Sequence, residues 1–61
     1  MRDKARIRPF MERLTQLWEE EVSDWRFAQL ISNIESFIGR DIFYIEDDKM
    51  SDIIEQFFKK K

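Results

Sequence analysis

The stretch VSDWRFAQLISNIESFIG, from Val22 to Gly39, decides the fold. Its large apolar residues recur every three or four positions, so they share one face of a helix over residues 25–38. That face consists of Phe27, Leu30, Ile31, Ile34, Phe37 and Ile38. A side-chain oxygen of Ser23 or Asp24 can cap the start of this helix. Gly39, the only glycine in the chain, suits a left-handed helix end.

A second amphipathic pattern precedes this helix and predicts another helix over residues 9–22. Its apolar face consists of Phe10, Met11, Leu14, Leu17, Trp18 and Val22. Pro9 suits a first helical position, and a residue before proline resists helical angles, so residues 1–8 are expected to form a basic arm. Only two residues separate this helix from the next, which favours an antiparallel pair of neighbours.

A third helix is predicted over residues 47–60, with an apolar face of Met50, Ile53, Ile54, Phe57 and Phe58. The connector before it, Ile42–Ile45, is β-branched and aromatic, so it is expected to be extended and to lie across the helices. The sequence therefore predicts an all-α fold. We expect one small three-helix bundle over residues 1–61, with an extended aromatic connector between the second and third helices.

Composition argues against most kinds of catalytic site. The 61 residues include no cysteine and no histidine, which removes thiolate chemistry, the commonest general base and the commonest metal ligand. A single glycine leaves no glycine-rich phosphate loop. No apolar run approaches the ~20 residues that a membrane span needs. We therefore expect a cytoplasmic protein that is not an enzyme, with no cofactor, no bound metal, no small-molecule substrate and no membrane contact.

Two polar groups invite more than one interpretation. The acidic run from Glu46 to Asp48 could hold a divalent cation, but it also complements the positive start of a helix, which is the favoured reading. Arg26, Gln29 and Asn33 share one edge of the second helix because they lie three and four residues apart. These three side chains could bind the backbone of a protein partner or an anionic ligand. The favoured alternative is a half-buried structural network in which Arg26 binds Asp47 or Asp48.

The aromatic residues suggest a surface for a partner. Trp25 points away from the apolar face of its helix, so it either anchors a partner or folds back onto Trp18 or Val22. About twenty large apolar residues occupy core-like positions, and a domain this small has difficulty burying them all. The residues that we expect to bind a partner are Trp25, Arg26, Gln29, Asn33, Phe43 and Tyr44.

Two segments of the chain resemble a group of small uncharacterised proteins encoded in bacterial genomes and prophages. The first is DWRFAQLISN, residues 24–33, and the second is DIFYIEDD, residues 41–48. The group has proline where this chain has Ser23 and Ile42, and glycine where it has Ala28. The resemblance implies a bacterial or phage cytoplasmic origin and implies no activity. It also implies that the residues shared with the pattern could form a single site; these are Arg26, Gln29, Asn33, Tyr44 and Asp47.

The leading functional hypothesis from the sequence is a module that binds a protein partner or a second copy of itself. The alternative is a nucleic-acid-binding accessory protein, possibly dimeric, that uses the basic chain ends. Those ends comprise Arg2, Lys4, Arg6 and Arg8 together with Lys59–Lys61. The net charge of −2 favours the protein-interaction hypothesis, because nucleic-acid binders usually carry a basic excess.

Overall fold

The computed structural model describes residues 2–60 and confirms an all-α fold of three packed helices. Helix α1 covers Ile7–Glu21, α2 covers Phe27–Ile38, and α3 covers Asp47–Lys60. A short 3₁₀ helix, η1, covers Lys4–Arg6 and leads directly into α1. No strand occurs among residues 2–60. Within the same residues, no helix combines the length and the apolar character that crossing a membrane requires.

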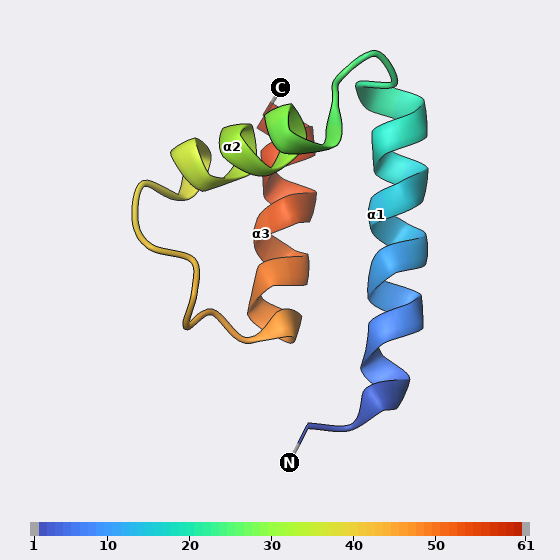
Figure 1. The fold of residues 1–61 in the computed structure, drawn as a ribbon, viewed down its shortest axis with the longest axis vertical. Coiled ribbons are helices and arrows are strands. Elements are labelled where there is room, and N and C mark those ends of the chain that lie inside the picture. Colours follow the sequence, from blue (N-terminus) through green and yellow to red (C-terminus); the bar gives the residue numbers. More distant parts are fainter. Residues whose placement is uncertain (1, 61) are drawn as a thin grey trace.

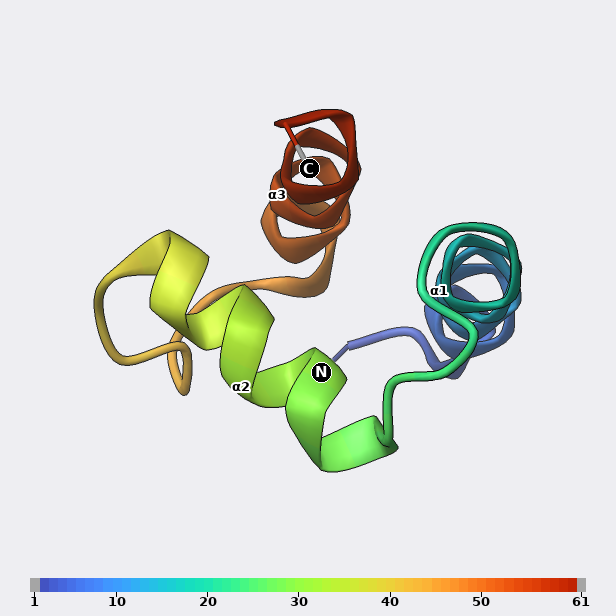
Figure 2. The ribbon, with the colours of Figure 1, turned by 90° about the horizontal axis from the view of Figure 1, so that it is seen from above.

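Helices α1 and α3 run in the same general direction, and α2 lies across them. Figure 1 shows both helices rising from the lower part of the molecule, with α2 crossing in front of the end of α3. Figure 2 shows α1 and α3 nearly end-on while α2 is seen from the side. Helix α3 packs against both α1 and α2. The expectation that the first two helices form an antiparallel pair is therefore wrong, because the 22–26 corner turns α2 across the bundle.

The buried core collects one face of each helix. Its members are Leu14, Leu17, Val22, Leu30, Ile34, Ile54, Phe57 and Phe58. Leu30 of α2 has no exposed surface, so it marks the centre of the core. The ring of Phe57 lies 5.4 Å from that of Phe37, 6.3 Å from that of Trp25 and 5.0 Å from that of Phe58, measured between centroids. This aromatic cluster joins α3 to α2 and to the preceding corner.

Hydrogen bonds define the corner between α1 and α2. The indole Nε1 of Trp18 donates to the backbone oxygen of Trp25 at 3.0 Å, and the nitrogen of Trp25 donates to the oxygen of Val22 at 2.9 Å. The amide oxygen of Gln29 accepts from the nitrogen of Arg26 at 2.8 Å. Because that nitrogen lies just before α2, Gln29 satisfies one of the donors that a helix start leaves without an internal partner.

The end of α2 agrees with the sequence prediction. Gly39 has φ +77°, and its nitrogen donates to the oxygen of Glu35 at 2.9 Å. A residue with a Cβ rarely adopts this left-handed conformation, which accounts for the position of the glycine.

The amino-terminal segment departs from the prediction of a basic arm. Residues 4–8 are helical, and α1 begins at Ile7 rather than at Pro9. The side chain of Asp3 starts this segment by accepting a hydrogen bond from the nitrogen of Ala5 at 2.9 Å. Pro9 lies in the first turn of α1, where its missing N–H removes little hydrogen bonding. Met1 lies outside the described residues, as do the side chain of Lys60 and all of Lys61.

The connector between α2 and α3 bends sharply at its centre. The nitrogen of Ile45 donates to the oxygen of Ile42 at 3.2 Å, which forms a turn. Ile42 and Ile45 are half-buried, whereas Phe43 and Tyr44 at the tip are largely exposed. The expectation that all four side chains lie across the helices is therefore wrong for the two aromatic residues. A tight turn can direct only part of its side chains toward the bundle.

Candidate functional site

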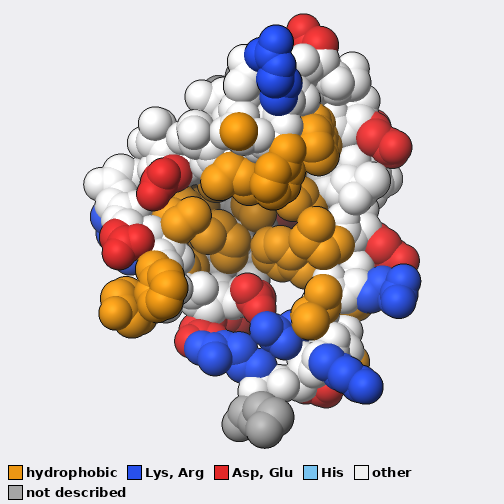
Figure 3. Space-filling view, viewed as in Figure 1, with side chains coloured by type: hydrophobic (Ala, Val, Ile, Leu, Met, Phe, Trp, Pro, Cys, Tyr) orange, Lys and Arg blue, Asp and Glu red, His pale blue; other side chains and the backbone are white. Residues whose placement is uncertain are grey.

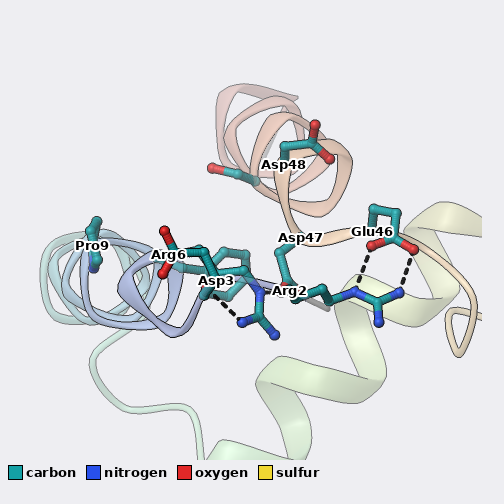
Figure 4. A pocket seen from close by; sticks show the side chains of 9 residues that line it. Arg2, Asp3, Arg6, Pro9, Glu46, Asp47 and Asp48 are labelled. Carbon is teal, nitrogen blue, oxygen red and sulfur yellow. Dashed lines mark hydrogen bonds and ion pairs between the residues drawn. The ribbon is translucent and has the colours of Figure 1, made fainter.

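A cavity of about 520 Å³ lies between the start of the chain and the start of α3. Its lining is mostly charged and comprises Arg2, Asp3, Arg6, Pro9, Phe10, Glu46, Asp47, Asp48 and Ser51. Figure 4 shows Arg2 reaching across to Glu46, with two hydrogen bonds joining the guanidinium to the carboxylate. The Nε of Arg6 donates to Asp47 at 2.5 Å. Both arginines are thus neutralised within the chain, which leaves little positive charge for an anionic ligand.

A third ion pair joins the middle of α1 to α3, where Arg13 contacts Glu55 through two hydrogen bonds of 2.6 and 2.9 Å. The hydrogen bonds from Arg13 lower the pKa of Glu55, and those from Arg2 lower the pKa of Glu46. All three pairs are exposed to solvent, and exposed pairs contribute little to stability. Of the three pairs, Arg13–Glu55 joins α1 to α3, and the other two join the residues before α1 to the start of α3.

The predicted network around Arg26 is not formed. Asp47 pairs with Arg6, and among residues 2–60 no ion pair joins Arg26 to Asp47 or Asp48. The reason lies in the fold, since Arg26 precedes α2 at the far end from the connector. Arg6 lies at the start of α1, beside the start of α3 (Figure 4). It is therefore Arg6, and not Arg26, that forms the ion pair with Asp47.

The structure separates the predicted partner-binding residues into two groups. Arg26 just before α2 and Gln29 and Asn33 within it are exposed, and the Gln29 side chain accepts a hydrogen bond from the nitrogen of Arg26. Trp25 is half-buried, and its ring contacts Phe57, so its ring is not a freely exposed anchor. The ring contact with Phe57 is one that the sequence did not suggest, whereas Trp18 and Val22, which it did suggest, are hydrogen-bonded to the backbone of Trp25.

Phe43 and Tyr44 form the second group, beyond the other end of α2. A helix of 12 residues is roughly 18 Å long, so Arg26 and Gln29 at one end of α2 lie well apart from Phe43 and Tyr44 beyond the other. Phe43 is 78% exposed and Tyr44 is 82% exposed. Their rings pack edge to face with centroids 4.8 Å apart. We call these two residues the aromatic pair.

The aromatic pair is held on a defined support. The nitrogen of Phe43 donates to the carboxylate of Asp41 at 3.0 Å, and the turn hydrogen bond from Ile45 to Ile42 closes behind it. Two large rings are therefore presented to solvent by a hydrogen-bonded turn. An exposed aromatic surface of this kind is unusual on a small domain unless another surface covers it.

A further exposed apolar surface lies along α1, and the sequence did not single it out. Ile7 is 51% exposed and Met11 is 45% exposed. They line a shallow groove of about 600 Å³ together with Lys4, Arg8, Glu12 and Thr15. We call these six residues the α1 groove. The sequence signal was the breadth of the apolar face of α1, which extends past the residues that reach the core.

Among residues 2–60, no group of three or more acidic side chains is arranged to hold a metal ion. The acidic run at the start of α3 instead binds Arg2 and Arg6 and occupies the first turn of the helix. Carboxylates in that position are stabilised by the helix dipole.

Comparison with known proteins identifies no relative of the chain. No protein family, no curated protein and no solved structure matches it.

Proposed function

We propose that this chain is a non-enzymatic protein-interaction module whose main anchor is the aromatic pair. The observation that carries the proposal is the exposure of Phe43 and Tyr44, about four fifths of each side chain, on a hydrogen-bonded turn. Aromatic side chains dominate the binding energy of protein interfaces because they bury a large area with few rotatable bonds. An anchor that is already ordered also loses less entropy on binding.

The rest of the surface is consistent with this proposal. The cavity between α1 and α3 has its two arginines neutralised by Glu46 and Asp47, so it lacks a concentrated charge for a substrate. The same ion pairs count against the nucleic-acid alternative, since two of the four basic residues at the amino-terminal end, Arg2 and Arg6, are bound to carboxylates. A phosphate would have to compete with those carboxylates for each arginine.

The test is affinity capture from bacterial cells with a tagged chain and a tagged Phe43→Ala/Tyr44→Ala variant. We expect the variant to lose the proteins that the original chain captures, because truncating both rings removes the anchor. Gln56→Ala, an exposed substitution on α3, is the matched control and should retain them. Circular dichroism must show that both variants keep their helices. Retention of the same proteins by the double variant would contradict the proposal.

The nucleic-acid alternative is tested separately by fluorescence anisotropy with short DNA and RNA duplexes at low salt, where phosphate contacts are strongest. Tight binding that weakens steeply with added salt would favour that alternative. An unchanged anisotropy up to high protein concentration would remove it.

A further inference from the structure

We infer that α1 pairs antiparallel with the α1 of a second copy of this chain. The surface that meets the second copy is one exposed flank of the helix, centred on Ile7, Arg8, Met11 and Glu12. We call these four residues the α1 quartet. Figure 1 shows α1 at the opposite side of the molecule from the connector that carries the aromatic pair. The inference therefore goes beyond the proposed function and is tested separately from it.

The α1 quartet lies on a part of the molecule that the other helices leave uncovered. Ile7 and Met11 are about half exposed, and Arg8 and Glu12 are also exposed. All four line the same shallow groove, so they share one flank of α1. Figure 2 shows α1 at the edge of the molecule, with α2 and α3 to one side of it only. This placement leaves room for a second helix to lie along α1.

The two opposite charges of the α1 quartet are not matched within the chain. Arg8 and Glu12 lie four residues apart, but within residues 2–59 neither takes part in an ion pair. A basic residue followed four positions later by an acidic one is the less favourable order within a helix. Arg8 also lies in the first turn of α1, where the helix dipole favours anions instead. Neither charge is therefore placed to stabilise its own helix.

An antiparallel arrangement brings each of these charges to its counterpart on the second copy. Residues 7 and 11 form one row along the flank and residues 8 and 12 form a second row, because side chains four apart lie one above the other. A two-fold axis through the centre of the quartet reverses each row onto itself. Ile7 then meets Met11 of the other copy, and Arg8 meets Glu12 of the other copy. The surface is complementary to itself, which is the condition for an isologous dimer.

The wider charge distribution along α1 favours the same direction. Figure 3 shows Lys and Arg side chains over the first turns of α1, at the lower right, and Asp and Glu side chains further along the same edge. Lys4 precedes the quartet in the α1 groove, and Glu19 is exposed two turns after Glu12. A parallel pair would set like charges side by side, whereas an antiparallel pair turns the basic end toward the acidic half. Complementary charges fix the register of an interface and raise the association rate.

The experiment is sedimentation equilibrium on the purified chain over micromolar to millimolar concentrations, at low salt, where exposed charges are screened least. We expect the mass to rise from 7.6 kDa toward twice that value and to stop there. Arg8→Glu and Glu12→Arg each place like charges opposite one another in both contacts, so each should weaken the dimer at least about tenfold. Arg40→Glu and Glu35→Arg make the same changes in net charge at exposed positions outside α1 and should leave the dimer unchanged.

A mixture of the two charge-reversed chains gives a sharper test. Arg8→Glu leaves two acids in the quartet and Glu12→Arg leaves two bases, so each variant repels itself. In a mixed dimer, every acid of one chain meets a base of the other. We expect the mixture to associate about as strongly as the original chain. The double variant Arg8→Glu/Glu12→Arg exchanges the two charges within one chain and should dimerise again. Circular dichroism must show that all variants keep their helices.

Three results would overturn the inference. A mass that stays at 7.6 kDa at every concentration excludes the second copy as the partner of this flank. A mass that grows beyond two copies excludes a closed two-fold pair. A dimer that neither charge reversal weakens, or that the mixture does not restore, has its contact elsewhere on the chain. None of these results bears on Phe43 and Tyr44, whose role is decided by the capture experiment.

Discussion

Replacing Gly39 by alanine is the most direct test of how the chain leaves α2. The residue has φ +77°, and an added Cβ would meet no atom within 4 Å. The cost of the substitution therefore comes from the backbone alone. A residue with a Cβ pays roughly 1–2 kcal/mol in the left-handed region. Alanine recovers roughly 0.4–1 kcal/mol of this by restricting the unfolded chain. We expect a net loss of about 1 kcal/mol on those two terms.

A loss of this size is measurable in so small a domain. At roughly 0.05–0.15 kcal/mol per residue, the whole chain is stable by about 3–9 kcal/mol. A loss of 1 kcal/mol lowers the Tm of such a domain by roughly 4–8 °C. The assay is urea unfolding followed by circular dichroism, at one fixed protein concentration so that self-association contributes equally. The slope of free energy against urea should not change.

The control for this measurement is Gly39→Asn. Asparagine tolerates the left-handed region better than alanine does, so it should cost less. If Gly39→Ala were neutral or stabilising, the left-handed end of α2 would not exist in solution. The path of the connector, and with it the placement of the aromatic pair, would then be wrong as well.

Three further predictions concern the core, the corner and the surface. Leu30→Ala, which empties the most buried position, should cost about 2–5 kcal/mol in urea unfolding, whereas Glu35→Ala on the exposed side of α2 should stay within about 0.5 kcal/mol. Trp18→Phe removes a hydrogen bond to a backbone oxygen of the corner and should cost about 1 kcal/mol; equal stability would mean that water replaces the bond. The pKa of Glu46 is lowered by Arg2, so the pair stabilises the fold above the ordinary glutamate pKa and loses this effect as pH falls through the lowered value. An NMR titration should therefore show a higher pKa for Glu46 in Arg2→Ala, and an unchanged value would mean that the pair does not form.

Much of the fold could be predicted because its signals are local. Gly39 predicted the end of α2, and the acidic run predicted the start of α3. The predicted start of α2 was wrong: the helix begins at Phe27 rather than at residue 25, and Gln29 rather than Ser23 or Asp24 satisfies the backbone at its start. The start of α1 was missed because Pro9 is tolerated anywhere in a first helical turn. Residues 4–6 also had a capping aspartate, Asp3, that the periodic pattern does not reveal.

The parts of the site that failed depend on distance in space rather than in sequence. Arg26 has the right chemistry for the acidic start of α3, but Arg2 and Arg6 lie next to it in the fold. The direction in which α2 crosses the other two helices determines which arginines lie near these acidic residues. No local sequence pattern encodes that direction. Phe43 and Tyr44 were named as partner-binding candidates, but the expectation that they also lie across the helices failed for the same reason, since an apolar run looks identical whether or not it packs on a core.

The attachment of the amino-terminal turns has a consequence for how the molecule opens. The 3₁₀ helix η1 buries no residue, and the ion pairs from Arg2 and Arg6 tie it to α3. Screening by salt shortens the reach of exposed charges from about 8 Å at physiological ionic strength to about 3 Å at 1 M. The first turns should then unravel while the core stays folded, with early loss of amide protection over residues 4–9 in hydrogen exchange. The α1 groove begins in those same turns, so high ionic strength should loosen its upstream wall.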